Sequence, residues 1–103
     1  MARLSADVLK ALLPPVDYYP RELTAMPPIR RPAGWVSGGL CPFHADRTAG
    51  NFRVNLDTGR YLCFSCGAKG GDIIAFHENR HGLGFEDALQ DLIETYRPWE
   101  VAS

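Results

Sequence analysis

Two pairs of potential metal ligands, each spaced by two residues, dominate the chemistry available to this sequence. Cys41 and His44 form the first pair, and Cys63 and Cys66 form the second pair after the interval 45–62. Zinc prefers four nitrogen or sulfur ligands in tetrahedral geometry, and a set of four protein ligands leaves no position for a substrate. The pattern therefore predicts one structural Zn²⁺ ion and no catalysis at that metal.

The spacing within each pair has a physical reason, because a two-residue turn directs both side chains to one ion. Gly67 suits the turn after the second pair, where a positive φ is often needed. Two alternatives are three reduced cysteines packed as small apolar side chains, and a redox Cys-x-x-Cys, which normally opens a helix in a βαβ unit. All three cysteines are used in the metal interpretation, and no signal peptide is visible, so we expect a reducing, cytoplasmic setting.

A second motif has the pattern H-E-x-x-H, with histidines at positions 77 and 81 and a glutamate at position 78. On a helix this spacing places two imidazoles on one face, as in zinc metallopeptidases. No further histidine follows, although Asp91 or Glu94 is a conceivable third ligand. We interpret the motif as surface residues of a helix. A minimal metallopeptidase is the alternative, and it predicts a second zinc ion and loss of activity in Glu78→Gln.

The elements that position these residues fit into one domain. The chain has 103 residues, of which 46% are hydrophobic and 22% charged. These values are ordinary for a globular domain and exclude a chain that is disordered throughout. No apolar run approaches the roughly 18 residues of a membrane span, so we expect no membrane association.

The N-terminal third predicts a helix followed by a proline-rich connection. Residues 5–13 read as a short helix with Ser5 as its N-cap and prolines at its end. Residues 14–34 contain six prolines, which predict an extended or turn-rich segment with a short helix near 21–26. A short irregular strand is expected at Trp35 and Val36.

The remainder predicts a hairpin and two helices. Residues 51–56 alternate polar and apolar side chains, and residues 60–64 form the return strand after a tight turn. Residues 72–81 predict a helix that Gly82 closes. A second helix ends before Pro98, and its apolar face comprises Phe85, Ala88, Leu89, Leu92, Ile93 and Tyr96.

Charge is distributed unevenly, although the net charge is only −1. Residues 30–69 carry six cations against two aspartates, whereas residues 70–103 carry two cations against seven acids. Two faces with different partners would produce this pattern, and so would an ordinary solvated surface.

At this point the sequence resembles the zinc-binding domain of bacterial DnaG-type DNA primases, from about Gly39 to Leu92. The resemblance rests on Leu40-Cys-Pro-Phe-His44, Arg47-Thr48, Phe52-Arg-Val54, Tyr61-Leu-Cys-Phe-Ser-Cys-Gly67, Gly70 to Asp72, Phe76, Gly82 and Phe85-Glu-Asp-Ala-Leu89. It implies an α+β fold, a zinc ribbon with a small antiparallel sheet and flanking helices. It also implies binding to single-stranded template DNA and support of primer initiation by a separate polymerase domain. Cys41, His44, Cys63 and Cys66 match the family's zinc ligands.

The predicted DNA surface is the hairpin face that carries Arg53 and Asn55. A two-residue loop would add Arg60 to this face, whereas a three-residue loop would add Tyr61 as a stacking ring. A solvated outer face with core aromatics is the alternative. The complete set of candidate nucleic-acid contacts is Arg47, Arg53, Asn55, Arg60, Tyr61 and Lys69.

The expected organisation is an N-terminal segment (1–34), the zinc-binding domain (35–97) and a tail (98–103). The chain contains no Asp-x-Asp of the kind that holds catalytic metals in the family, so a catalytic domain or subunit must come from elsewhere, and a helicase is a further expected partner. Two interpretations of the chain fit this pattern. It is either a free-standing protein, as a mobile element would encode, or the N-terminal piece of a longer primase. A zinc-ribbon adaptor that binds only protein is the alternative function.

Overall fold

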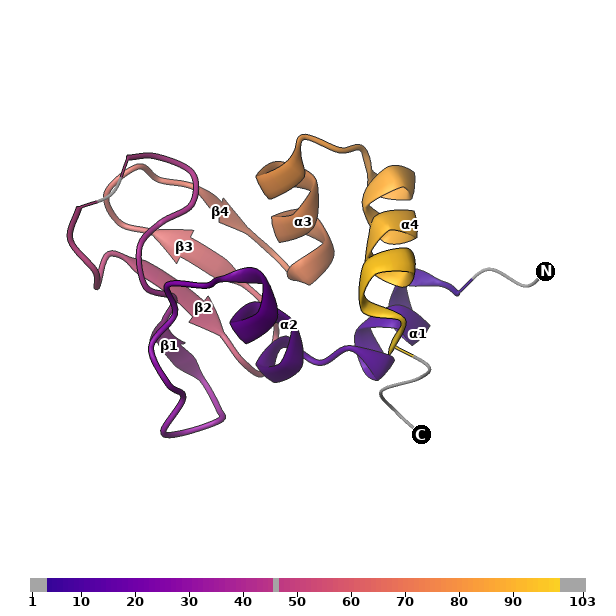
Figure 1. The fold of residues 1–103 in the computed structure, drawn as a ribbon, viewed down its shortest axis with the longest axis horizontal. Coiled ribbons are helices and arrows are strands. Elements are labelled where there is room, and N and C mark those ends of the chain that lie inside the picture. The colour runs from indigo at the N-terminus through magenta and orange to yellow at the C-terminus, as the bar shows by residue number, and fades with distance from the viewer. Residues whose placement is uncertain (1–3, 46, 99–103) are drawn as a thin grey trace.

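Local sequence signals set the ends of two helices in the computed structural model, which describes residues 4–45 and 47–98 (Figure 1). The first helix, α1 (Ala6–Leu12), begins after Ser5, whose hydroxyl accepts a hydrogen bond from the Val8 N–H at 3.2 Å. The helix α3 (Ile73–His81) begins after Asp72, whose carboxylate accepts from Ala75, and ends at Gly82 with φ 66°. Both predicted helices are confirmed.

The proline-rich segment differs from the prediction, because it contains the helix α2 (Pro15–Glu22). The expected short helix near residues 21–26 is wrong, and so is an extended chain at 15–22. Pro15 occupies the first turn, where a missing N–H costs nothing. Pro20 lies inside the helix, but Tyr18 and Tyr19 are fully buried, so tertiary packing outweighs the poor local propensity.

The last helix, α4 (Phe85–Tyr96), packs alongside α3, as Figure 1 shows. Its predicted apolar face is confirmed in the main, because Ala88, Leu89, Leu92 and Tyr96 are buried. Phe85, the first residue of the helix, is instead about half exposed. No helix among residues 4–45 and 47–98 is long and apolar enough to cross a membrane.

Four short antiparallel strands form one sheet in chain order, β1-β2-β3-β4. The predicted strand at Trp35 and the predicted hairpin are both confirmed. An antiparallel sheet with separate helices is an α+β fold, as expected, and it fits a zinc ribbon. The strands are β1 (Trp35–Ser37), β2 (Phe52–Asn55), β3 (Tyr61–Cys63) and β4 (Lys69–Gly70).

An aromatic core joins one face of this sheet to the helices. Phe76 of α3 lies with its ring centroid 5.1 Å from that of Tyr61 and 5.2 Å from that of Tyr19. The Tyr19 hydroxyl donates to the carbonyl of Gly59 in the hairpin turn at 2.5 Å. The helix α2 therefore belongs to the same core as the sheet.

Candidate metal centre and sheet surface

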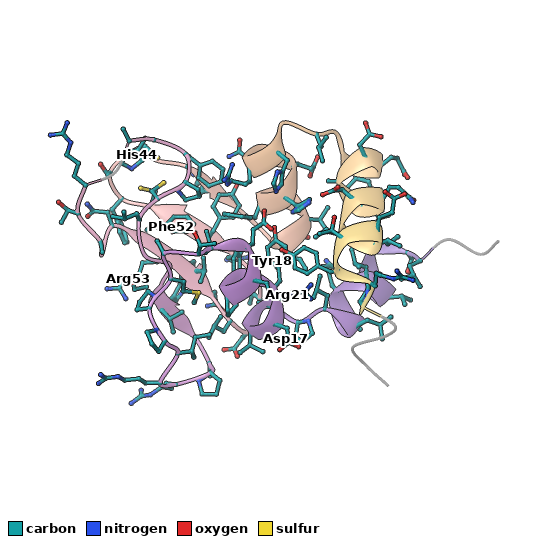
Figure 2. The ribbon with its side chains drawn as sticks, viewed as in Figure 1. Asp17, Tyr18, Arg21, His44, Phe52 and Arg53 are labelled. Carbon is teal, nitrogen blue, oxygen red and sulfur yellow. The ribbon has the colours of Figure 1, made fainter. Side chains whose placement is uncertain are left out.

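Two turns bring the four predicted ligands together, and Figure 2 shows one of them, His44, at one end of the sheet. Cys41 and His44 lie in the loop between β1 and β2, whereas Cys63 ends β3 and Cys66 lies in the turn that leads to β4. The sulfur atoms and one imidazole nitrogen all lie within 4.8 Å of one another. Because the two pairs come from loops on opposite sides of the hairpin, an ion held between them ties those loops to each other.

The distances within this group fit a tetrahedral zinc site. The Sγ atoms of Cys41 and Cys66 are 3.8 Å apart, and Cys63 Sγ lies 3.5 Å from His44 Nε2. With Zn–S of about 2.3 Å and Zn–N of about 2.05 Å, a tetrahedron places two sulfurs about 3.8 Å apart and a sulfur and nitrogen about 3.5 Å apart. The chemistry and spacing of the donors therefore support one structural zinc.

Backbone N–H groups donate hydrogen bonds to the sulfurs of Cys41 and Cys63. The Phe43 N–H donates to Cys41 Sγ at 3.4 Å. Gly67 has φ 79° in the turn after the second pair, which confirms the left-handed position expected for it. Burial would raise the pKa of the Cys63 thiol, but hydrogen bonds from the backbone N–H groups of Cys66 and Ser65 and from His44 lower that pKa to about 7.

The pKa of the Cys41 thiol shifts in the opposite direction from that of Cys63. Burial raises it to about 12 despite the hydrogen bond from the Phe43 N–H. Zinc binds thiolates, so occupation of the site must displace the proton of this thiol. Four protein ligands leave no open coordination position, and the ion therefore serves the fold and not a reaction.

Strand register decides which side chains share the open face of the sheet. Arg53 pairs with Leu62, and Leu62 pairs in turn with Lys69. The hairpin loop has four residues, 56–59, because the Asn55 N–H bonds to the Arg60 carbonyl at 2.8 Å. A four-residue loop, like the two-residue alternative, is even in length, so it directs the side chains of Arg60 and Arg53 to the same face of the sheet.

This register corrects the prediction for Tyr61. Its side chain points to the core face opposite Val54, is only 3% exposed and stacks on Phe43 with ring centroids 5.5 Å apart. A base cannot stack on a ring that is already covered by the core, so the expectation of Tyr61 as a stacking surface is wrong.

The other predicted contacts lie in different places. Figure 2 shows Arg53 on the side of the sheet away from the helices. Arg47 is exposed in the loop after His44 and is not part of the sheet. The side chain of Asn55 stabilises the hairpin loop, because its Oδ1 accepts hydrogen bonds from the N–H groups of Asp57 and Thr58 at 2.9 and 3.0 Å.

Two aromatic side chains on the open face were not among the predicted contacts. Trp35 pairs with Asn55 in the register and is 48% exposed, and Phe64, just beyond the end of β3, is 70% exposed. Two open hollows of about 520 and 480 Å³ share Trp35 and Leu62 as walls. The alternation of side chains along a strand could have indicated Phe64, because residues 60, 62 and 64 fall on the same face of an extended strand.

The H-E-x-x-H residues are not all at the surface, which corrects our interpretation of that motif. His77 is 1% exposed and hydrogen-bonds Asp91, whereas Glu94 bonds Gln90 and lies outside the group. The structure instead places Glu22, at the end of α2, beside His77 and His81. Sequence reasoning missed Glu22 because only the unexpected helix α2 brings it there.

Comparisons with known proteins agree with this geometry. The family model described as CHC2 zinc finger, the zinc ribbon of DnaG, matches residues 30–99. The DNA primase of Lactococcus lactis subsp. lactis is 45% identical over 56 residues, which cover 54% of this chain and 8% of the relative.

Two further relatives extend the comparison. The DNA primase of Borreliella burgdorferi is 46% identical over 56 residues, which cover 54% of this chain and 10% of the relative. The DNA primase of Treponema pallidum is 38% identical over 88 residues, which cover 85% of this chain and 14% of the relative. The chain thus spans about a tenth of the length of the first curated relatives that it matches.

Proposed function

Because this chain belongs to the CHC2 zinc finger family, the zinc ribbons of DnaG, we propose that it binds single-stranded template DNA for a DNA primase. In this proposal the zinc ion stabilises the sheet, and the open face of the sheet contacts the strand. The chemistry of primer synthesis comes from a catalytic domain or subunit outside residues 1–103.

The observation that carries the proposal is the combination of aromatic and basic side chains on one face. Proteins that bind single strands place cations along the phosphate path and flat rings beneath the bases. Trp35 and Phe64 are exposed rings, and Arg53, Arg60 and Lys69 lie on or beside the same face. The two hollows beside Trp35 offer room for unstacked bases.

The charge distribution supports the same orientation. The excess of cations in residues 30–69 includes those of the sheet, whereas the acidic excess of residues 70–103 covers α3 and α4. Phosphates would be attracted to the sheet and repelled by the helices. The helical side therefore stays available for a protein partner.

The partners follow from the family and are part of the proposal. We expect the chain to act with a catalytic primase domain or subunit, and with a helicase, in the cytoplasm, where thiolate ligands stay reduced. Mixing this chain with a candidate catalytic subunit and single-stranded template tests the assignment. Primers should form efficiently only when both proteins are present, and an unchanged primer yield without this chain would contradict it.

Binding itself is tested by fluorescence anisotropy of a labelled single-stranded oligonucleotide at low salt. Arg53→Ala and Arg60→Ala together should weaken binding and lower the salt dependence, whose slope is about 0.7 per phosphate contacted. Lys10→Ala and Arg80→Ala together remove two helical cations and serve as the matched control.

Circular dichroism and zinc content must show that both double variants remain folded. Equal affinity of the wild type and the Arg53/Arg60 variant would contradict the proposed face. Absence of any salt-dependent binding in the wild type would instead favour an adaptor that binds only protein.

A further inference from the structure

A second group of metal-binding side chains lies among the helices, away from the cysteines. We propose that Glu22, His77 and His81 form a second site for a divalent first-row metal ion such as Zn²⁺. Their ligand atoms all lie within 4.8 Å of one another. The group contains two imidazoles and one carboxylate, a donor set that suits zinc and its neighbours in the first transition row.

The geometry follows from two helices that meet at this point. His77 and His81 are one turn apart on α3, and their ring centroids are 4.3 Å apart. Glu22, the last residue of α2, brings Oε1 to 3.9 Å from His77 Nδ1 and into a hydrogen bond with His81 Nε2. An ion between these atoms would join the end of α2 to α3.

Neighbouring residues hold the ligands in the orientation that an ion requires. Asp91 of α4 lies 2.6 Å from His77 Nε2, so its carboxylate keeps a proton on that nitrogen and leaves Nδ1 facing Glu22. The Tyr96 hydroxyl donates to Glu22 Oε2 at 2.5 Å, and Oε1 is the carboxylate oxygen that faces the two imidazoles. A carboxylate that accepts the other ring N–H is a usual support of metal-bound histidine, and ligating carboxylates are usually hydrogen-bonded in turn.

Two hydrogen bonds compete with the metal, and one of them is the bond between His81 Nε2 and Glu22 Oε1. The Tyr18 hydroxyl lies 2.8 Å from His77 Nδ1, and with the proton on Nε2 it acts as the donor. A bound ion takes the place of this hydrogen bond, so removal of the hydroxyl should tighten metal binding. This competition is a specific consequence of coordination through Nδ1.

Access to the site is from the side of His81. The exposed side-chain fractions are 1% for His77, 13% for Glu22 and 37% for His81, so one ligand reaches solvent. Three protein ligands leave a coordination position for water. Glu78 is not one of the three grouped ligands.

The test uses the full chain with its cysteine site already filled by zinc. Zn²⁺ is titrated by calorimetry, and Co²⁺ is titrated by absorption spectroscopy. The first equivalent of Co²⁺ added to this zinc-loaded chain should give weak d–d bands without the intense thiolate charge-transfer bands of the cysteine site. Paramagnetic effects of this Co²⁺ in NMR spectra should be centred on residues 22, 77 and 81.

Four variants locate the ion. His81→Ala should lower the affinity for the second metal ion at least about tenfold. Asp91→Asn should lower this affinity about 10–100-fold, because His77 loses its hydrogen-bond partner. Tyr18→Phe should bind the second metal ion more tightly than the wild type, because the competing hydroxyl is removed. Glu78→Gln, on the same helix but outside the group, is the matched control and should bind as the wild type does.

Three results would overturn the proposal. They are a wild-type protein that takes up only one ion at micromolar free zinc, a His81→Ala variant that binds the second ion as well as the wild type, and paramagnetic effects centred elsewhere. The NMR measurement needs no variant, so a variant that fails to fold does not affect it.

Discussion

The Sγ atoms of Cys41 and Cys66 lie 3.8 Å apart, although 25 positions separate the two residues in the chain. The first residue precedes β2 and the second follows β3. Cys63 lies within hydrogen-bond range of the same group, and both Cys41 and Cys63 are buried, so the loops converge on one point. The ion therefore connects the two loops that flank the hairpin, and the sheet surface depends on it.

Removal of zinc should unfold the sheet. A structural zinc contributes about 10–16 kcal/mol of apparent binding free energy in zinc-finger peptides, which is comparable with the whole stability of a typical domain, about 5–15 kcal/mol. Chelation, or Cys63→Ser, should abolish cooperative thermal unfolding measured by circular dichroism. Ser65→Ala changes an exposed residue between two ligands and should retain both the zinc and the transition.

Zinc binding should weaken as pH falls. Burial holds the pKa of the Cys41 thiol at about 12, so this group is protonated at neutral pH before the ion binds. Each proton displaced makes the apparent affinity fall about tenfold per pH unit on acidification. Calorimetry in buffers of different ionisation enthalpy should show release of at least one proton per zinc. A proton count of zero, or an affinity that does not vary between pH 6 and 8, would contradict this account.

Trp35→Ala should weaken binding to single-stranded DNA with little effect on folding, because the ring is half exposed on the open face. Stacking of a base on an aromatic side chain contributes about 1–3 kcal/mol, or roughly 5- to 150-fold in affinity. Fluorescence anisotropy measures the change. Phe85→Ala removes an equally exposed ring from α4 and should have no effect. Equal losses in the two variants would show that the sheet is not the binding face.

Gly39→Ala should destabilise the chain just before the first zinc ligand. Gly39 has φ 82°, and a Cβ atom there would lie 2.3 Å from the carbonyl oxygen of Ala25. We expect a loss of at least about 1 kcal/mol in urea unfolding of the zinc-loaded protein. Gly71→Ala, where a Cβ meets no atom within 4 Å, is the matched control and should change stability by less than about 0.5 kcal/mol.

Sequence patterns predicted the elements whose signals are local. Ser5, Asp72 and Gly82 act as helix caps, and the x-x spacing of the ligands needs only a short turn to bring each pair together. These features depend on neighbours within a few positions, so they can be read from the sequence.

The features that sequence patterns did not predict depend on distant contacts. The helix α2 forms because Tyr18 and Tyr19 are buried against residues far along the chain, and no local pattern indicates this. The face of the sheet on which Tyr61 lies depends on whether the hairpin loop has an even or an odd number of residues, and the sequence allowed both. Glu22 meets His77 only after α2 has packed, so the third member of the helical metal group could not be identified in advance.

Binding of single-stranded DNA to the open face of the sheet is tested most directly by an NMR titration of the ¹⁵N-labelled, zinc-loaded chain with an unlabelled single-stranded oligonucleotide at low salt. If the open face binds the strand, chemical shifts should change at Trp35, Arg53, Leu62 and Lys69 and not on α4, and the changes should reverse when salt is added. Absence of shift changes, or changes confined to α4, would contradict binding at this face.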